Sequence, residues 1–96
     1  MEMLVTYDVS TETPEGKRRL RRVAKVCEAY GQRVQKSVFE CKLNEAQLEQ
    51  LRHRLVQEVE PVQDSLRIYR LTEPRERYLQ IIGVQPRHDL RDPLVL

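Results

Sequence analysis

Glycine is scarce in this sequence, and its three copies stand far apart along the 96 residues. A phosphate-cradling loop needs several glycines within a few positions, so the chain carries neither a P-loop nor a dinucleotide-binding fingerprint. Histidine and cysteine occur only twice each. His53 and His88 have no motif partner and are interpreted as surface residues, and two thiols without further ligands make no zinc site. No spacing of Ser, His, Cys and acidic residues suggests a catalytic nucleophile.

Long apolar runs are also missing. No run approaches the roughly 20 residues of a membrane-spanning helix, and the start, MEMLVTYDV, lacks the basic segment and cleavage site of a signal peptide. We therefore expect a cytoplasmic protein in which Cys27 and Cys41 are buried thiols rather than a disulfide. At 96 residues the chain has room for one domain, placed at residues 1–83, followed by a polar tail at residues 84–96. A chain this short gains stability from self-association, because a monomer buries only roughly 60–65% of its unfolded surface.

Acidic residues are nearly absent from one stretch of the chain. The net charge is +2, but residues 16–36 hold eight basic side chains against one acidic side chain, which gives +7 there and −5 elsewhere. Such an asymmetry indicates an anionic partner, either a nucleic acid or a phosphate group. A basic helix face that is only solvated is the alternative, and charge alone does not decide between the two.

Hydrophobic patterning predicts alternating strands and helices. Strands are expected at residues 3–9, 33–43 and 64–71, and helices at residues 14–30 and 45–59. Thr13 is expected to cap the first helix and Gly31 to end it as a C′ glycine, while Asn44 and Gln47 match a capping box for the second. Residues 33–43 form either one long strand or two short strands broken near Ser37, and periodicity does not choose between them.

The order of elements matches a ferredoxin-like α+β sandwich, βαββαβ, with two helices on one face of an antiparallel sheet. This plan leaves the other sheet face open, and we expect the protein to form a homodimer through it. The apolar stretch YLQIIG, residues 78–83, is predicted to be an extra C-terminal strand. It has no place in the four-stranded plan, so we expect it to extend an edge of its own sheet or of a partner's sheet.

Asp8 stands at the end of an otherwise apolar strand, in the stretch LVTYDVST. Loops and ligands gather at such strand ends. A lone carboxylate is a weak Mg²⁺ site because the ion takes about six oxygens, but two copies of Asp8 across a two-fold axis make a stronger one. A metal held there against a phosphate activates water for in-line hydrolysis. The alternative is that Asp8 is only a turn residue.

Three segments of the chain, LVTYDVS, KRRLRRVAKVCEAYGQRVQKSVFEC and DSLRIYRL, resemble the CRISPR-associated protein two (Cas-two) family. The likeness extends to about Gly83 and is greatest to the subtype I-C branch. It implies a ferredoxin-like homodimer with Asp8 as the catalytic ligand of Mg²⁺, or of another divalent cation such as Mn²⁺, at the dimer interface. It also implies an endonuclease or endoribonuclease of spacer acquisition in antiviral defence, acting with the Cas-one integrase on double-stranded DNA or single-stranded RNA.

The resemblance and the basic cluster together assign roles to further residues. Contacts to nucleic-acid phosphates are expected from Arg18, Arg19, Arg22, Lys25 and Arg33. Such contacts position a backbone without reading its sequence. Supporting positions around the site are Tyr7, Ser10, Ser37 and Phe39. For Ser37 a serine that satisfies the backbone at a strand break is an equal alternative, and for Phe39 a core position is preferred.

Two other functions fit the same residues. One is a non-catalytic DNA-binding scaffold that bridges Cas-one dimers, with Asp8 only structural. The other is a toxin ribonuclease of the VapD kind, which shares the fold. Because few aromatic residues are free to stack bases, the sequence slightly favours duplex DNA over single-stranded RNA.

Overall fold

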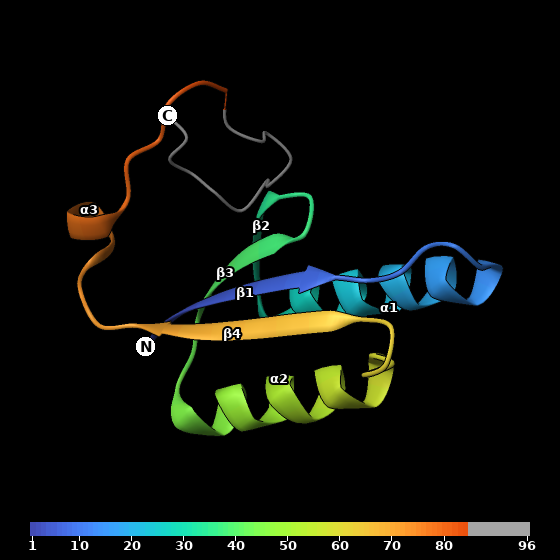
Figure 1. The fold of residues 1–96 in the computed structure, drawn as a ribbon. Coiled ribbons are helices and arrows are strands. Elements are labelled where there is room, and N and C mark those ends of the chain that lie inside the picture. Colours follow the sequence, from blue (N-terminus) through green and yellow to red (C-terminus); the bar gives the residue numbers. More distant parts are fainter. Residues whose placement is uncertain (85–96) are drawn as a thin grey trace.

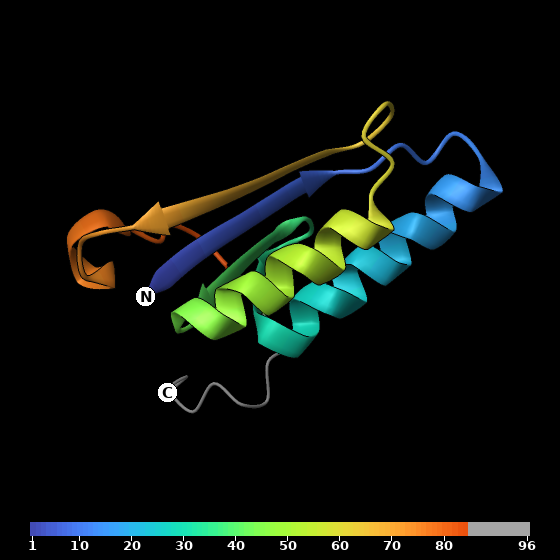
Figure 2. The same cartoon turned by 90° about the horizontal axis from the view of Figure 1, so that it is seen from below.

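The structure is a computed structural model of the chain, and it describes residues 1–84. In chain order its elements are β1 (Glu2–Asp8), α1 (Pro14–Tyr30), β2 (Gly31–Gln35), β3 (Val38–Lys42), α2 (Glu45–Glu58), β4 (Ser65–Leu71) and α3 (Arg75–Tyr78). The strands form one antiparallel sheet in the order β2-β3-β1-β4. Helices α1 and α2 lie side by side on one face of this sheet (Figures 1 and 2). This confirms the predicted ferredoxin-like α+β architecture.

Both long helices begin at the predicted caps. Thr13 Oγ1 accepts the backbone N–H of Gly16 at 3.0 Å. The Asn44 and Gln47 side chains each accept the other's backbone N–H, at 2.8 and 2.9 Å, and so form the expected capping box. These bonds satisfy amides that have no partner inside the helix. None of the helices in residues 1–84 is long and apolar enough to cross a membrane.

Gly31 follows the last residue of α1, as predicted, but not as a left-handed C′ glycine. Its backbone is extended, with φ −161° and ψ −164°, and it is the first residue of β2. The position needs glycine because a Cβ there would collide with the Sγ atom of Cys41 on β3. Gly31 still caps the helix, because its backbone N–H donates to the carbonyl oxygen of Cys27. Close packing between neighbouring strands, and not a left-handed backbone, is the reason for glycine here.

Residues 33–43 form two strands, which decides between the two alternatives. A turn at Lys36 and Ser37 separates β2 from β3. The register of the pair shifts between Arg33 and Gln35, so that Gln35 lies opposite Val38. A shift of this kind is a β-bulge, which bends a strand and re-aims its side chains.

The core lies between the sheet and the two long helices. Alternate residues of β1 point into it, and Val5 is completely buried together with Phe39 of β3 and Leu51 of α2. Cys27 and Cys41 are free and buried, as expected. Burial raises the pKa of the Cys27 thiol to about 12 and that of Cys41 to about 11, which keeps both protonated at neutral pH.

The predicted extra strand is wrong for this chain on its own. Residues 75–78 form the short helix α3, and residues 79–84 pair with no strand of the sheet. Ile82 is left 91% exposed. An apolar run predicts that a segment is buried against something, but it does not show which sheet edge the segment pairs with. The predicted tail, apart from Val84, lies outside the described residues.

Candidate metal and nucleic-acid site

Asp8 is the last residue of β1 and faces away from the helices. Burial alternates along the strand, with Met3, Val5 and Tyr7 inside and Asp8 exposed on the open face. It lies opposite Ser65, the first residue of β4. Within residues 1–84 its carboxylate takes part in no hydrogen bond or ion pair. The fold therefore leaves this carboxylate available for an external ligand.

The backbone before Asp8 is held by the β2–β3 turn. The backbone N–H of Tyr7 donates to the carbonyl oxygen of Ser37 at 3.1 Å, and the Tyr7 hydroxyl makes a long 3.5 Å hydrogen bond to the carbonyl of Lys36. Ser37 therefore supports the end of β1 through its backbone carbonyl oxygen and not through its hydroxyl. It matches the alternative in which this serine marks a strand break.

Phe39 and Tyr7 pack together on the face of the sheet that the helices cover. Their ring centroids are 6.2 Å apart, and Phe39 is completely buried, so it is a core residue. The guanidinium of Arg33 lies 5.2 Å from the centroid of the Phe39 ring and 3.6 Å from the Glu28 carboxylate. Arg33 is thus held on the helix side of the sheet, with its Nε atom buried and unpaired in the structure. Burial raises the pKa of Tyr7, which keeps its hydroxyl protonated.

Arg19, expected to contact phosphates, is instead used inside the fold. Its Nε atom lies 2.9 Å from Oδ2 of Asp64, and only 13% of its side chain is exposed. Hydrogen bonding from Arg19 holds the pKa of the Asp64 carboxyl at about 2, below its ordinary value. This corrects the prediction, because a guanidinium committed to an internal carboxylate is not free for a phosphate.

The other basic residues of α1 differ in how free they are. Arg22 makes a 2.8 Å ion pair with Glu58 at the end of α2, and Arg18 lies 3.8 Å from Glu15 with both side chains open to solvent. Lys25 is exposed and has no partner among residues 1–84. Pairs as open as that of Arg18 contribute little and compete weakly with a phosphate.

Two basic residues that were not predicted to contact phosphates are free as well. Lys17 and Arg21 are exposed and carry no side-chain interaction within the described part of the chain. With Lys25 they are spaced four residues apart, so all three lie on one face of α1, about 6 Å apart along its axis. We call Lys17, Arg21 and Lys25 the basic stripe. The spacing was visible in the sequence, but which neighbouring arginines had acidic partners was not.

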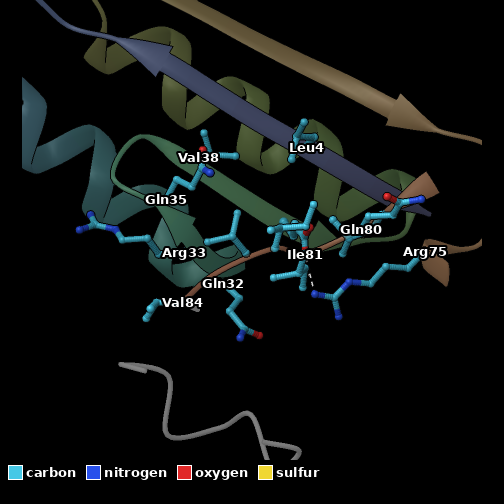
Figure 3. A pocket seen from close by; sticks show the side chains of 13 residues that line it. Leu4, Gln32, Arg33, Gln35, Val38, Arg75, Gln80, Ile81 and Val84 are labelled. Atoms are coloured by element: carbon cyan, nitrogen blue, oxygen red, sulfur yellow. Dashed lines mark ion pairs between the residues drawn. The ribbon is translucent and has the colours of Figure 1, made fainter. Parts of the chain in front are cut away.

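A pocket of about 340 Å³ lies on the open face of the sheet (Figure 3). Leu4, Val38 and Gln32 line it from the sheet, and Ile81 lines it from the C-terminal segment. A 3.1 Å ion pair between Arg75 and Glu40 crosses the pocket. Asp8 is not among the residues that line it. The pocket is the space between the sheet and residues 75–84, and the candidate metal ligand lies elsewhere.

Residues 1–84 contain no group of three or more His, Cys, Asp or Glu side chains that could hold a metal ion. The candidate at the end of β1 is the Asp8 carboxylate, with the Ser10 hydroxyl nearby in sequence. These groups fit Mg²⁺ only if waters and substrate phosphates supply its remaining ligands. In proteins Mg²⁺ keeps several waters and is bound through one or two carboxylates together with substrate phosphates.

Comparison with known proteins shows which family the chain resembles. The family model for "CRISPR associated protein Cas2" matches residues 1–78. The chain is 62% identical, over the full length of both, to "CRISPR-associated endoribonuclease Cas2 1" of Moorella thermoacetica. It is 48% identical to "CRISPR-associated endonuclease Cas2" of Halalkalibacterium halodurans, over 99% of each chain. Among solved structures, Cas2 of Streptococcus pyogenes superimposes with a TM-score of 0.78 and 51% identity, covering 86% of this chain and all of that one.

Proposed function

The chain belongs to the Cas-two (Cas2) family of CRISPR-associated proteins, and we propose that it is a metal-dependent nuclease of spacer acquisition that acts with the Cas-one integrase. The observation that carries the proposal is the free carboxylate of Asp8 at the end of β1. The names of two close relatives, an endoribonuclease and an endonuclease, support phosphodiester hydrolysis.

The proposed site is completed by a second copy of the chain. The open face of the sheet exposes Tyr69 of β4, and the adjoining segment exposes Ile81 and Ile82. Covering this surface with a second copy removes apolar area from water, at about 25 cal/mol per Å². A two-fold axis through the open face brings the two Asp8 carboxylates to one interface.

In this dimer the residues of the chain have separate tasks. When bound, Mg²⁺ supplies an activated water and neutralises charge on the reacting phosphate. Asp8 from each copy supplies a negatively charged oxygen ligand. The basic stripe, with Arg18 and Arg22 beside it, holds the nucleic-acid backbone through its phosphates. These contacts carry no sequence information, so cleavage is expected to be insensitive to sequence.

Duplex DNA is the favoured substrate over single-stranded RNA. Binding of single strands relies on aromatic side chains that stack on bases. Among the described residues Phe39 and Tyr7 are buried, and Tyr30 is covered by the Arg54 guanidinium, 5.5 Å from its ring centroid. Tyr69 is exposed, but it lies on the face assigned to the dimer. Tyr78 on α3 is half-buried. A backbone-directed basic surface therefore remains as the main means of binding.

A scaffold without catalysis is the second candidate. It is favoured by the lack of any acidic or histidine cluster around Asp8 within residues 1–84. In this case the basic stripe binds the duplex between Cas-one dimers, and Asp8 has no role in hydrolysis. Membership of the Cas-two family removes the support for the VapD-like toxin alternative.

One experiment separates the two candidates. Labelled duplex DNA and single-stranded RNA are incubated with wild type and with Asp8→Asn, in Mg²⁺ or EDTA, and binding of the same duplex is measured in parallel. The nuclease proposal expects metal-dependent cleavage that the Asp8→Asn variant loses while its affinity for DNA is kept. Cleavage that survives the substitution contradicts it, and no cleavage by wild type with intact binding supports the scaffold.

A further inference from the structure

The Asp64 carboxylate is completely buried and accepts four hydrogen bonds. Its Oδ1 atom receives the backbone N–H of Ser10 at 3.0 Å and Arg19 Nη2 at 3.2 Å. Its Oδ2 atom receives Arg19 Nε at 2.9 Å and the backbone N–H of Glu60 at 2.8 Å. Two donors on each oxygen fill the acceptor sites of a carboxylate. Burying such a charge is costly unless it is paired and bonded in this way.

These four bonds join three parts of the fold, and two of them reach partners 54 and 45 residues from Asp64 in the sequence. Ser10 belongs to the loop after β1, Arg19 to α1, and Glu60 to the turn between α2 and β4. The junction lies at the end of the sheet that carries Asp8. Asp8 pairs with Ser65, the residue after Asp64, and Ser10 is two residues beyond Asp8. Asp64 therefore continues the β1–β4 contact past the last strand pair.

A second, independent contact fixes the same loop residue. Gly16 in the first turn of α1 is buried, and a Cβ at this position would collide with the carbonyl oxygen of Ser10. The N–H of Gly16 is itself bonded to Thr13 Oγ1, at the other end of the loop. Ser10 is thus held through its N–H by Asp64 and through its carbonyl by contact with the helix.

We propose that Arg19 and Asp64 are positioning residues for the Asp8 site, because they fix Ser10 and with it the course of the chain as it leaves Asp8. The inference rests on the proposed role of Asp8 as a metal ligand. It assigns Arg19 to the geometry of the site and not to the binding of phosphates. A displacement of about 1 Å at a reacting group can cost on the order of 100-fold in rate, so fixing the loop has a catalytic consequence.

The chain provides a matched control in Arg22 and Glu58. This pair links α1 to the end of α2, with Arg22 Nε 2.8 Å from the Glu58 carboxylate. Both of its side chains are partly open to solvent, and Glu58 accepts no hydrogen bond from the loop after β1. Glu58→Gln therefore removes another charge pair of α1 without touching Ser10.

The test compares wild type, Asp64→Asn, Glu58→Gln and Asp8→Asn as full-length chains. Asparagine keeps the size of the aspartate but turns one acceptor oxygen into a donor that faces two other donors. Hydrogen exchange of the Ser10 amide is followed by NMR, Mn²⁺ affinity by EPR, and kcat, KM and duplex affinity with labelled DNA. Arg19→Lys, which keeps the charge but loses the two-pronged contact, is the second variant if Asp64→Asn fails to fold.

We expect Asp64→Asn to speed exchange at Ser10, to weaken Mn²⁺ binding and to lower kcat by about 10- to 100-fold. The duplex affinity of Asp64→Asn stays within about twofold of wild type, and Glu58→Gln leaves Ser10 exchange, Mn²⁺ affinity and kcat within about twofold. The inference is overturned if Ser10 exchange rises while kcat and Mn²⁺ affinity stay at wild-type values, or if Glu58→Gln lowers them equally. If instead the proposed role of Asp8 is wrong, the Asp8→Asn variant itself keeps wild-type Mn²⁺ affinity and cleavage. If wild type cleaves neither substrate, the Mn²⁺ measurement alone decides.

Discussion

Asp8 lies directly opposite Ser65 in the last pair of the β1–β4 ladder. On the other side of β1, the N–H of Tyr7 is bonded to the carbonyl of Ser37 in the β2–β3 turn. The end of this central strand is therefore held from both neighbours, while the Asp8 side chain is left exposed. A rigid backbone that presents an unpaired carboxylate suits a ligand site better than a turn.

Neutralising the basic stripe is expected to weaken DNA binding and its dependence on salt. For duplex DNA, the slope of log K against log salt becomes shallower by about 0.9 for each phosphate that the protein no longer neutralises. Lys17→Gln, Arg21→Gln and Lys25→Gln combined therefore reduce the slope by about 2.7. Fluorescence anisotropy of a labelled duplex over a range of salt concentrations measures it. Arg52→Gln on α2, where the arginine pairs with Glu49, is the control, and an equal effect in that variant would argue against the stripe.

Acid is expected to destabilise the protein through Asp64. Its pKa in the folded chain is about 2, against an ordinary value of 3.8, chiefly because Arg19 is hydrogen-bonded to the charged form. A lowered folded pKa stabilises the fold fully above the unfolded value, and this contribution is lost as the pH falls through about 4 towards about 2.

Urea unfolding at several pH values tests this expectation. The difference in free energy of unfolding between wild type and Asp64→Asn should be largest near neutral pH and should shrink below about pH 4. A difference that stays constant down to pH 2 would mean that the Asp64 charge does not contribute in this way.

Phe39 is expected to act on stability and not on nucleic-acid binding. Its side chain is completely buried, so Phe39→Ala should lower the free energy of unfolding by about 3 to 5 kcal/mol. Phe39→Leu, which leaves a smaller cavity, should cost less and keep the affinity for DNA. A folded Phe39→Leu variant that binds DNA much more weakly would instead support a direct role in binding.

The apolar segment after α3 is expected to lie in the dimer interface. Ile82 is 91% exposed beside the open face, whereas Val62 is 89% exposed in the turn between α2 and β4. Ile82→Asp should raise the dimer dissociation constant at least about tenfold, the cost of burying an unpaired charge, while Val62→Asp should leave it unchanged. Sedimentation equilibrium measures both, and the interface is assigned wrongly if the two variants behave alike.

Local signals in the sequence were sufficient for most of the fold. The caps at Thr13 and Asn44 and the strand-end position of Asp8 depend on residues close in sequence, and the structure has them where they were predicted. Arg19 and Asp64 are 45 residues apart, so nothing local indicated that this arginine is used internally. A charge cluster shows how many basic residues a segment holds but not which of them are paired across the fold.

The C-terminal segment shows a second limit. The run YLQIIG has the composition of a strand, yet a strand needs an edge to pair with. Neither the apolar pattern nor the described residues of one chain supply that edge, and the segment is unpaired in the structure. The role of Gly31 was misjudged for a similar reason, because the close packing against Cys41 arises only when β2 and β3 come together.

The most direct measurement of the central claim is the number of metal ions bound per dimer. Mn²⁺ is titrated into wild type and Asp8→Asn, and the bound ion is counted by EPR at protein concentrations where the oligomeric state has been determined. We predict one Mn²⁺ for every two chains, and loss of this binding in the Asp8→Asn variant. Binding of one ion per chain, or binding that the substitution leaves intact, would contradict a site built from two Asp8 carboxylates.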